Sequence, residues 1–168
     1  MVNKTLQLKI SEFDKNVHNG EAELLEKVKA FVSDYSVQKL TGLKKEQYVY
    51  GTGSKNTFCY RVTHELYQWG SIRNGTPNKY GFYFKPNAED NESNYRCNKV
   101  FGNTDTEVAT NEAFDKVKLA LFDLIVAGNN GDFKAIQDNP LSTIFKGKVL
   151  CIYYPDKYMT GILSGRCE

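Results

Sequence analysis

The sequence contains few of the residues that build metal or disulfide sites. It has only two histidines, His18 and His64, and no C-x-x-C motif. Its four cysteines are widely and irregularly spaced, at Cys59, Cys97, Cys151 and Cys167. A structural zinc site needs several such ligands at short spacings, so no metal site is expected. A disulfide framework is not expected either, and we predict reduced thiols.

Long apolar runs are also missing. No run of apolar residues approaches the ~18 that are needed to span a bilayer. The first residues, MVNKTLQLKIS, lack the apolar core and the small-residue cleavage site of a signal peptide. We therefore predict a cytoplasmic protein.

Charge of one sign is not in excess, because the net charge is only +2. A global basic field is thereby excluded, and any contact with nucleic acid must be local. The remaining composition, 40% hydrophobic and 25% charged, is typical of a globular protein. A chain of 168 residues fits one domain that can bury a sizeable core.

The spacing of apolar residues predicts an α+β fold. Helical spacing predicts helices over 21–35, 37–42, 58–69, 110–128 and 132–137. Alternating or continuous apolar runs predict strands over 6–10, 79–85, 95–101 and 148–154, with a return over 158–163. We expect a single domain over residues 1–168, with a mixed or antiparallel sheet packed against two main helices.

The segment 56–85 mixes aromatic and cationic residues most densely. Thr57 or Asn56 is placed to cap the helix that follows, and Gly70 to end it. The stretch 71–85 then carries three cations and no acid. In its strand, Tyr80 and its alternate neighbours would face one way, and Lys79, Tyr83 and Lys85 the other. That second face fits either a phosphate-and-base contact surface or an ordinary amphipathic strand.

No catalytic constellation is recognisable. The stretch 51–57 lacks the spacing of a nucleotide P-loop, although a polar loop before a helix can bind an anion. No G-x-S-x-G elbow occurs, and no cysteine has a histidine at a motif spacing. Asp123, Asp132 and Asp138 are close in sequence but lie on helical or turn positions. We expect no catalytic residue, metal or cofactor.

The order of short motifs from Asn56 onward carries a resemblance. The motifs read Asn56-Thr57-Phe58-Cys59-Tyr60, Trp69-Gly70-Ser71-Ile72-Arg73-Asn74-Gly75, Lys79-Tyr80-Gly81-Phe82-Tyr83, Gly102-Asn103-Thr104 and Glu112-Ala113-Phe114, followed by the apolar run 148–154. This order resembles the amino-terminal domain that precedes the AAA+ core of McrB-like proteins, the specificity subunits of modification-dependent, McrBC-type DNA restriction. The resemblance covers residues 56–163. It departs at Asn74, where the family has glycine, and the chain has no Walker motif.

The resemblance implies a domain that reads duplex DNA, and a modified base in it, for an AAA+ motor and a nuclease encoded elsewhere. Related domains extrude the modified base into an aromatic pocket. The residues that the resemblance suggests for stacking are Tyr60, Trp69 and Tyr80, with core packing as the alternative for Trp69. Those suggested for DNA contact are Lys55, Arg61, Arg73, Asn74, Lys79, Tyr83, Lys85 and Arg96.

Two other functions remain open at the level of sequence. One is a protein-interaction module whose aromatic strand adds to the sheet edge of a partner. The other is a small nuclease with a dispersed site. The modification, the preference for single or double strands and the oligomeric state are not indicated by the sequence.

Overall fold

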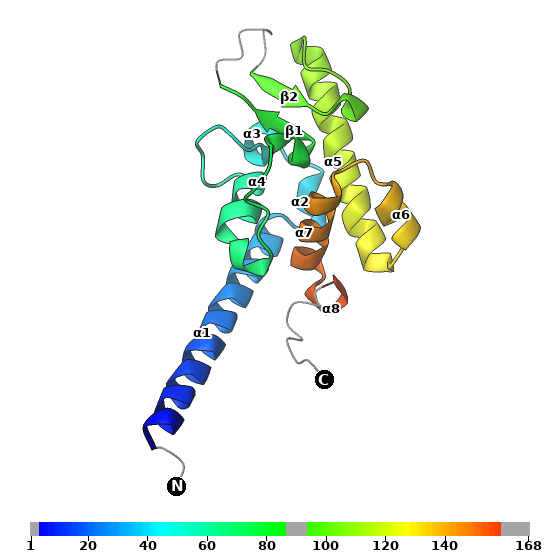
Figure 1. The fold of residues 1–168 in the computed structure, drawn as a ribbon. Helices are drawn as coiled ribbons and strands as arrows, with labels where there is room; N and C mark the ends of the chain where they lie inside the picture. Colours follow the sequence, from blue (N-terminus) through cyan, green and yellow to red (C-terminus); the bar gives the residue numbers. More distant parts are fainter. Residues whose placement is uncertain (1–3, 87–93, 159–168) are drawn as a thin grey trace.

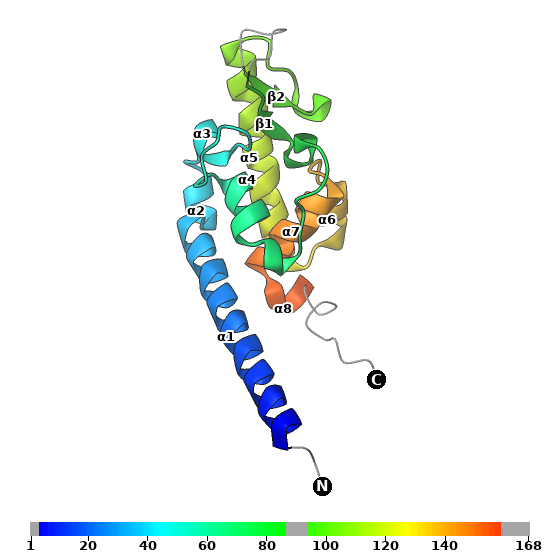
Figure 2. The same ribbon diagram turned by 60° about the vertical axis from the view of Figure 1, so that its left-hand side comes forward.

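A computed structural model describes residues 4–86 and 94–158 of the chain. This part is mostly helical, with one small two-stranded antiparallel sheet (Figure 1). The α+β class is confirmed in this coarse form. The sheet, however, lies at one end of the molecule beside a long helix, and helices form most of the core (Figures 1 and 2).

The chain begins with α1, a helix over Lys4–Asp34. The strand predicted over 6–10 is therefore wrong, and the helix predicted over 21–35 begins much earlier. Three alternating apolar residues are a weak strand signal, whereas apolar residues recur at helical steps of three, four or, across Gly20, seven positions from Leu6 to Tyr35. Near the end of the helix, Val28, Phe31 and Tyr35 enter the core.

Two single-turn helices follow, α2 over Val37–Leu40 and α3 over Lys45–Tyr48. The predicted helix over 58–69 is present as one helical stretch in which α-helical, π-helical and 3₁₀-helical turns follow one another. It consists of α4 (Phe58–Tyr60), the π-helix η1 (Arg61–Glu65) and the 3₁₀-helix η2 (Tyr67–Trp69).

The predicted ends of this stretch are confirmed. The Thr57 hydroxyl accepts a hydrogen bond from the Tyr60 amide at 3.3 Å, which caps the helix. Gly70 ends it with a φ of 94°, a conformation that favours glycine. Both signals are local, which is why the sequence could carry them.

The two strands are shorter than predicted. The 3₁₀-helix η3 (Pro77–Tyr80) precedes β1 (Phe82–Phe84), and β2 (Tyr95–Cys97) precedes the 3₁₀-helix η4 (Lys99–Phe101). The register pairs Phe82 with Cys97 and Phe84 with Tyr95. Lys79 and Tyr80 lie in η3 and not in β1, so the strand alternation predicted from residue 79 does not apply to these two residues.

The last part of the fold is helical: α5 (Glu107–Asn130), α6 (Phe133–Asp138), α7 (Thr143–Tyr153) and α8 (Pro155–Tyr158). The helices predicted over 110–128 and 132–137 are confirmed, with α5 longer at both ends. The strand predicted over 148–154 is wrong, because this run forms most of α7. Of the return predicted over 158–163, Tyr158 is helical and the rest lies outside the described residues.

α7 has no polar face because it is buried on several sides. Phe145, Val149 and Ile152 lie in the core, and the side chains of Lys146 and Lys148 are buried as well. A helix enclosed in this way loses the amphipathic pattern, and its sequence then resembles a buried strand. The core that surrounds it is rich in aromatic rings, with Phe31, Tyr48, Phe58 and Phe114 in a chain of ring contacts.

No helix in the described ranges is long and apolar enough to cross a membrane. Cys59, Cys97 and Cys151 are free thiols. Cys167 lies outside the described residues.

Candidate nucleic-acid interface

Three half-buried rings lie together at the surface, and we call Tyr50, Tyr60 and His64 the aromatic patch. The planes of Tyr50 and Tyr60 are 15° apart, with their centroids 6.4 Å apart. Tyr50 and His64 are 17° and 5.8 Å apart, and Tyr60 and His64 have centroids 4.5 Å apart. Near-parallel rings at an accessible surface can stack on a nucleobase.

Local helix geometry places two of these rings side by side. Tyr60 and His64 are four residues apart, so they share one face of the helical stretch. The backbone widens there into the π-helix η1, where the Leu66 amide donates to the Arg61 carbonyl. Single-turn π-helices are frequent at functional sites.

Tyr50 reaches the patch from a different part of the chain. The Phe84 amide in β1 donates a 2.8 Å hydrogen bond to the Tyr50 carbonyl. The phenol of Tyr50 is 3.1 Å from the His64 Nε2 atom, within hydrogen-bond distance. Gly51 follows with a φ of 109°, and a Cβ atom there would lie 2.2 Å from the Phe84 carbonyl oxygen. Only glycine permits this close approach.

Tyr80 supports the patch from below. Its ring centroid is 5.4 Å from that of Tyr50, and its side chain is only 1% exposed. Its phenol is 2.6 Å from the Thr63 hydroxyl, and burial raises the pKa of Tyr80. Tyr80, suggested for stacking on a base, thus stacks on Tyr50 and has almost no face open to solvent.

Two cations flank the aromatic patch. Arg73 lies over the ring of Tyr67 at 3.8 Å, and its Nη2 atom donates to the His64 carbonyl at 3.5 Å. Lys79 was predicted on a face open to contact, but the structure buries it to 9% exposure, and its ammonium donates to the Asn74 carbonyl at 3.1 Å. The pKa of His64 is lowered by burial and by the charges of Arg73 and Lys79. The patch therefore has a positive field, which suits a phosphate.

Four of the residues suggested by the resemblance thus come together, namely Tyr60, Arg73, Asn74 and Lys79. Arg61 has a different environment: it donates to Asp34 at 2.8 Å and to Glu65 at 2.6 Å, and its side chain is 14% exposed. Trp69 is buried, with its indole nitrogen donating to the Cys151 carbonyl at 2.9 Å. Of the two roles considered for Trp69, base stacking and core packing, the structure shows core packing.

The other suggested contacts are spread over the surface near the sheet. Lys55 is exposed in the loop after Tyr50, and Lys85 is exposed directly after β1. Tyr83 is half-buried in β1. Arg96 is half-buried in β2 and donates to the Tyr95 carbonyl at 2.7 Å.

Neither Tyr50 nor His64 was singled out from the sequence for this site. The four-residue spacing of Tyr60 and His64 was a usable signal for a shared face. No sequence signal indicates that Tyr50 joins them, because its position depends on the hydrogen bond to Phe84.

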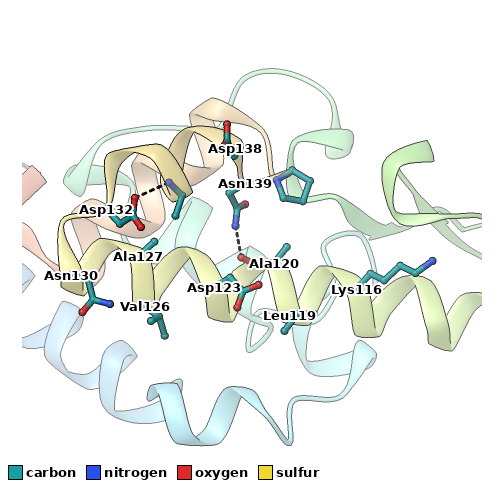
Figure 3. Close-up of a pocket in the computed structure, with 12 residues that line it drawn as sticks. Lys116, Leu119, Ala120, Asp123, Val126, Ala127, Asn130, Asp132, Asp138 and Asn139 are labelled. Atoms are coloured by element: carbon teal, nitrogen blue, oxygen red, sulfur yellow. Dashed lines mark hydrogen bonds between the residues drawn. The ribbon is translucent and has the colours of Figure 1, made fainter.

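The carboxylates considered for a nuclease line a groove between α5 and α6 (Figure 3). Asp132 uses its carboxylate to accept from the Ala135 amide at 3.0 Å, as the cap of α6. Asn139 donates to the Ala120 carbonyl at 2.7 Å across the same groove. Among the described residues, no group of three His, Cys, Asp or Glu side chains is placed to hold a metal ion.

Strand addition to a partner would require an open sheet edge. On each strand, one outward backbone group already has a partner within the chain. The amide of Phe84 in β1 is bonded to Tyr50, and the carbonyl of Tyr95 in β2 accepts from the Thr104 hydroxyl at 2.8 Å. The protein-interaction alternative therefore has little support in the sheet.

Comparisons of the chain with known protein families, curated proteins and solved structures gave no match. The geometry of the aromatic patch and its cations is thus the basis for a functional assignment.

Proposed function

We propose that this protein is a DNA-binding domain that holds a base on the aromatic patch while Arg73 and Lys79 lie near the phosphates. The observation that carries the proposal is the near-parallel packing of Tyr50 with Tyr60 and with His64, beside two cations. An aromatic surface of this kind gives affinity for the base, and the cations give affinity for the backbone.

The biological setting follows the resemblance to McrB-like amino-terminal domains. We propose a cytoplasmic specificity domain of a restriction or phage-defence system, acting on duplex DNA and reading a modified base. The domain would supply recognition without catalysis, and an AAA+ motor and a nuclease subunit would supply the rest. A base in a duplex reaches an aromatic surface only when it is extruded from the stack.

The test is fluorescence-anisotropy titration of matched duplexes, unmodified and cytosine-modified, at two salt concentrations. We expect binding that weakens steeply with salt, because each displaced counterion adds to the slope. A preference for the modified duplex would support base readout. Absence of binding at low salt, or binding that salt does not change, would overturn the proposal and favour a protein-interaction module.

Variants separate the aromatic from the cationic contribution. Stacking of one base contributes ~1–3 kcal/mol, so Tyr60→Leu should weaken binding about tenfold. Phe133→Leu is the matched control, because Phe133 is 74% exposed on α6, outside the patch. Arg73→Gln should reduce the salt slope by about one, with Lys134→Gln on α6 as its control. Equal effects of each variant and its control would contradict the assignment of these residues.

A further inference from the structure

The amino-terminal part of α1 projects beyond the rest of the described fold. In both views it extends away from the domain, and no other labelled element lies beside it (Figures 1 and 2). The place where α1 leaves the body is marked by a hollow. Its lining includes Gly20, Leu24 and Lys27 of α1, Tyr67 and Gln68 of η2, and the three acidic residues Glu21, Glu23 and Glu65.

The sequence of the projecting part has a coiled-coil pattern. Leu6, Ile10, Phe13 and Val17 are separated by four, three and four positions, which are the d, a, d and a positions of two heptads. Gly20 occupies the next d position and ends the pattern. An isolated helix of this length is marginal in water, so an apolar stripe on it calls for a partner helix.

The charged residues at the e and g positions, beside the apolar stripe, indicate the orientation and identity of the partner helix. In this frame Lys9, which is exposed, is at a g position, and Asp14 is at the e position of the next heptad. In a parallel pair of identical helices, a g residue of one helix meets the e residue five positions later on the other. Lys9 would then meet Asp14 twice, once on each side of the pair. An antiparallel pair sets g against g and e against e, and forms no such Lys–Asp pair.

We propose that two copies of this chain associate through a parallel two-stranded coiled coil formed by residues 4–19 of α1. The partner is a second copy, because the apolar stripe and the Lys9–Asp14 pairs are complementary to themselves. The assignment does not depend on DNA binding and can be tested without DNA.

The experiment is sedimentation equilibrium of the full chain over a range of concentrations, followed by charge variants. Ile10→Asp should abolish the dimer. Lys9→Glu sets a glutamate against Asp14 twice and should weaken the dimer roughly tenfold. Lys15→Glu is the matched control, because residue 15 is at the outer f position and the same charge change there should leave the dimer intact.

Mixing two variants gives the sharpest outcome. Lys9→Glu and Asp14→Lys should each weaken self-association, yet their mixture should restore it. In the mixed pair the glutamate introduced at position 9 meets the lysine introduced at position 14, and the unchanged Lys9 meets the unchanged Asp14. Residues five positions apart do not face each other within one helix, so a change in helix stability would not produce this rescue. A monomer at every concentration, equal effects of the Lys9 and Lys15 variants, or a mixture that shows no rescue would each overturn the proposal.

Discussion

The ammonium of Lys148 donates a 2.9 Å hydrogen bond to the carbonyl of Trp69, and so joins α7 to the end of the helical stretch that carries the aromatic patch. Lys148 also donates to the Leu66 carbonyl. Its side chain is 4% exposed, and burial lowers its pKa to about 8. A buried lysine thus takes the place of further backbone hydrogen bonds where this helical stretch ends.

Replacing this lysine should weaken the fold. Lys148→Met removes both hydrogen bonds while keeping much of the apolar volume, and we expect a loss of about 2 kcal/mol in the free energy of unfolding. Urea denaturation at neutral pH measures it, with Lys134→Met, an exposed residue of α6, as the control. A loss no larger than that of the control would show that the two hydrogen bonds do not stabilise the fold.

Because the pKa of Lys148 is lowered in the folded protein, its contribution to the free energy of unfolding should rise with pH. Its pKa is about 8 in the folded protein, against an ordinary value of 10.5. Between these values the unfolded chain keeps a proton that the folded chain has released, so the Lys148 contribution grows as pH rises. The difference in unfolding free energy between wild type and Lys148→Met should be flat below pH 8 and widen above it. A difference that narrows above pH 8 would contradict the pKa direction.

Gly51 should be intolerant of a side chain. Its φ is 109°, and a Cβ atom would clash with the Phe84 carbonyl oxygen at 2.2 Å. Gly53 has a similarly unfavourable φ of 81° but no atom within 4 Å of its Cβ position. We expect Gly53→Ala to cost about 1 kcal/mol and Gly51→Ala about 3 kcal/mol, measured by thermal denaturation. Equal costs would mean that the contact with Phe84 can relax freely.

Substitution of Arg61 should lower the stability of the fold, whereas substitution of Arg73 should lower its affinity for DNA. Arg61 is paired with Asp34 and Glu65 and lies over the ring of Phe31 at 5.3 Å. We expect Arg61→Gln to lower stability by about 1–2 kcal/mol and to leave DNA affinity nearly unchanged. Arg73→Gln should leave stability nearly unchanged and weaken DNA binding. Urea denaturation and anisotropy on the same two variants decide between these assignments, and a loss of affinity in Arg61→Gln at full stability would return that residue to the DNA contacts.

DNA affinity should depend on the protonation of His64. Burial, Arg73 and Lys79 lower the pKa of His64 in the free protein, and a nearby phosphate would raise it. Binding then takes up a proton, so affinity rises as pH falls from 8 to 5. Each unit of pKa rise corresponds to about tenfold tighter binding at low pH. His64→Gln should flatten this dependence, whereas His18→Gln should keep it. A slope that survives in His64→Gln would assign the proton uptake to another group.

Much of the helical part of the fold was predictable from sequence. The apolar stripe of α5 and the caps at Thr57 and Asp132 lie within a few residues of the structure they specify. Such signals need no knowledge of distant contacts. Four residues of the candidate site, Tyr60, Arg73, Asn74 and Lys79, belong to the one segment that the sequence singled out.

The two wrong strands have different physical causes. Over 6–10 the run was too short to separate a period of two from a period of 3.6 residues. Over 148–154 every residue after Lys148 is apolar, because α7 is buried on several sides, and Lys148 itself donates to the distant Trp69 carbonyl. Burial on all sides removes the periodicity that distinguishes a helix from a strand.

By itself the sequence determined the ends of the helical stretch 58–69 and, within a few residues, the extent of α2, α5 and α6, because stripes, caps and glycine stops act locally. The tertiary structure decided which aromatic residues remain accessible. It buried Trp69 against Cys151, 82 positions away in the chain, and brought Tyr50 to His64 through a hydrogen bond to β1. Exposure and proximity depend on the packing of the whole chain, so only the fold could separate the rings of the core from those of the aromatic patch.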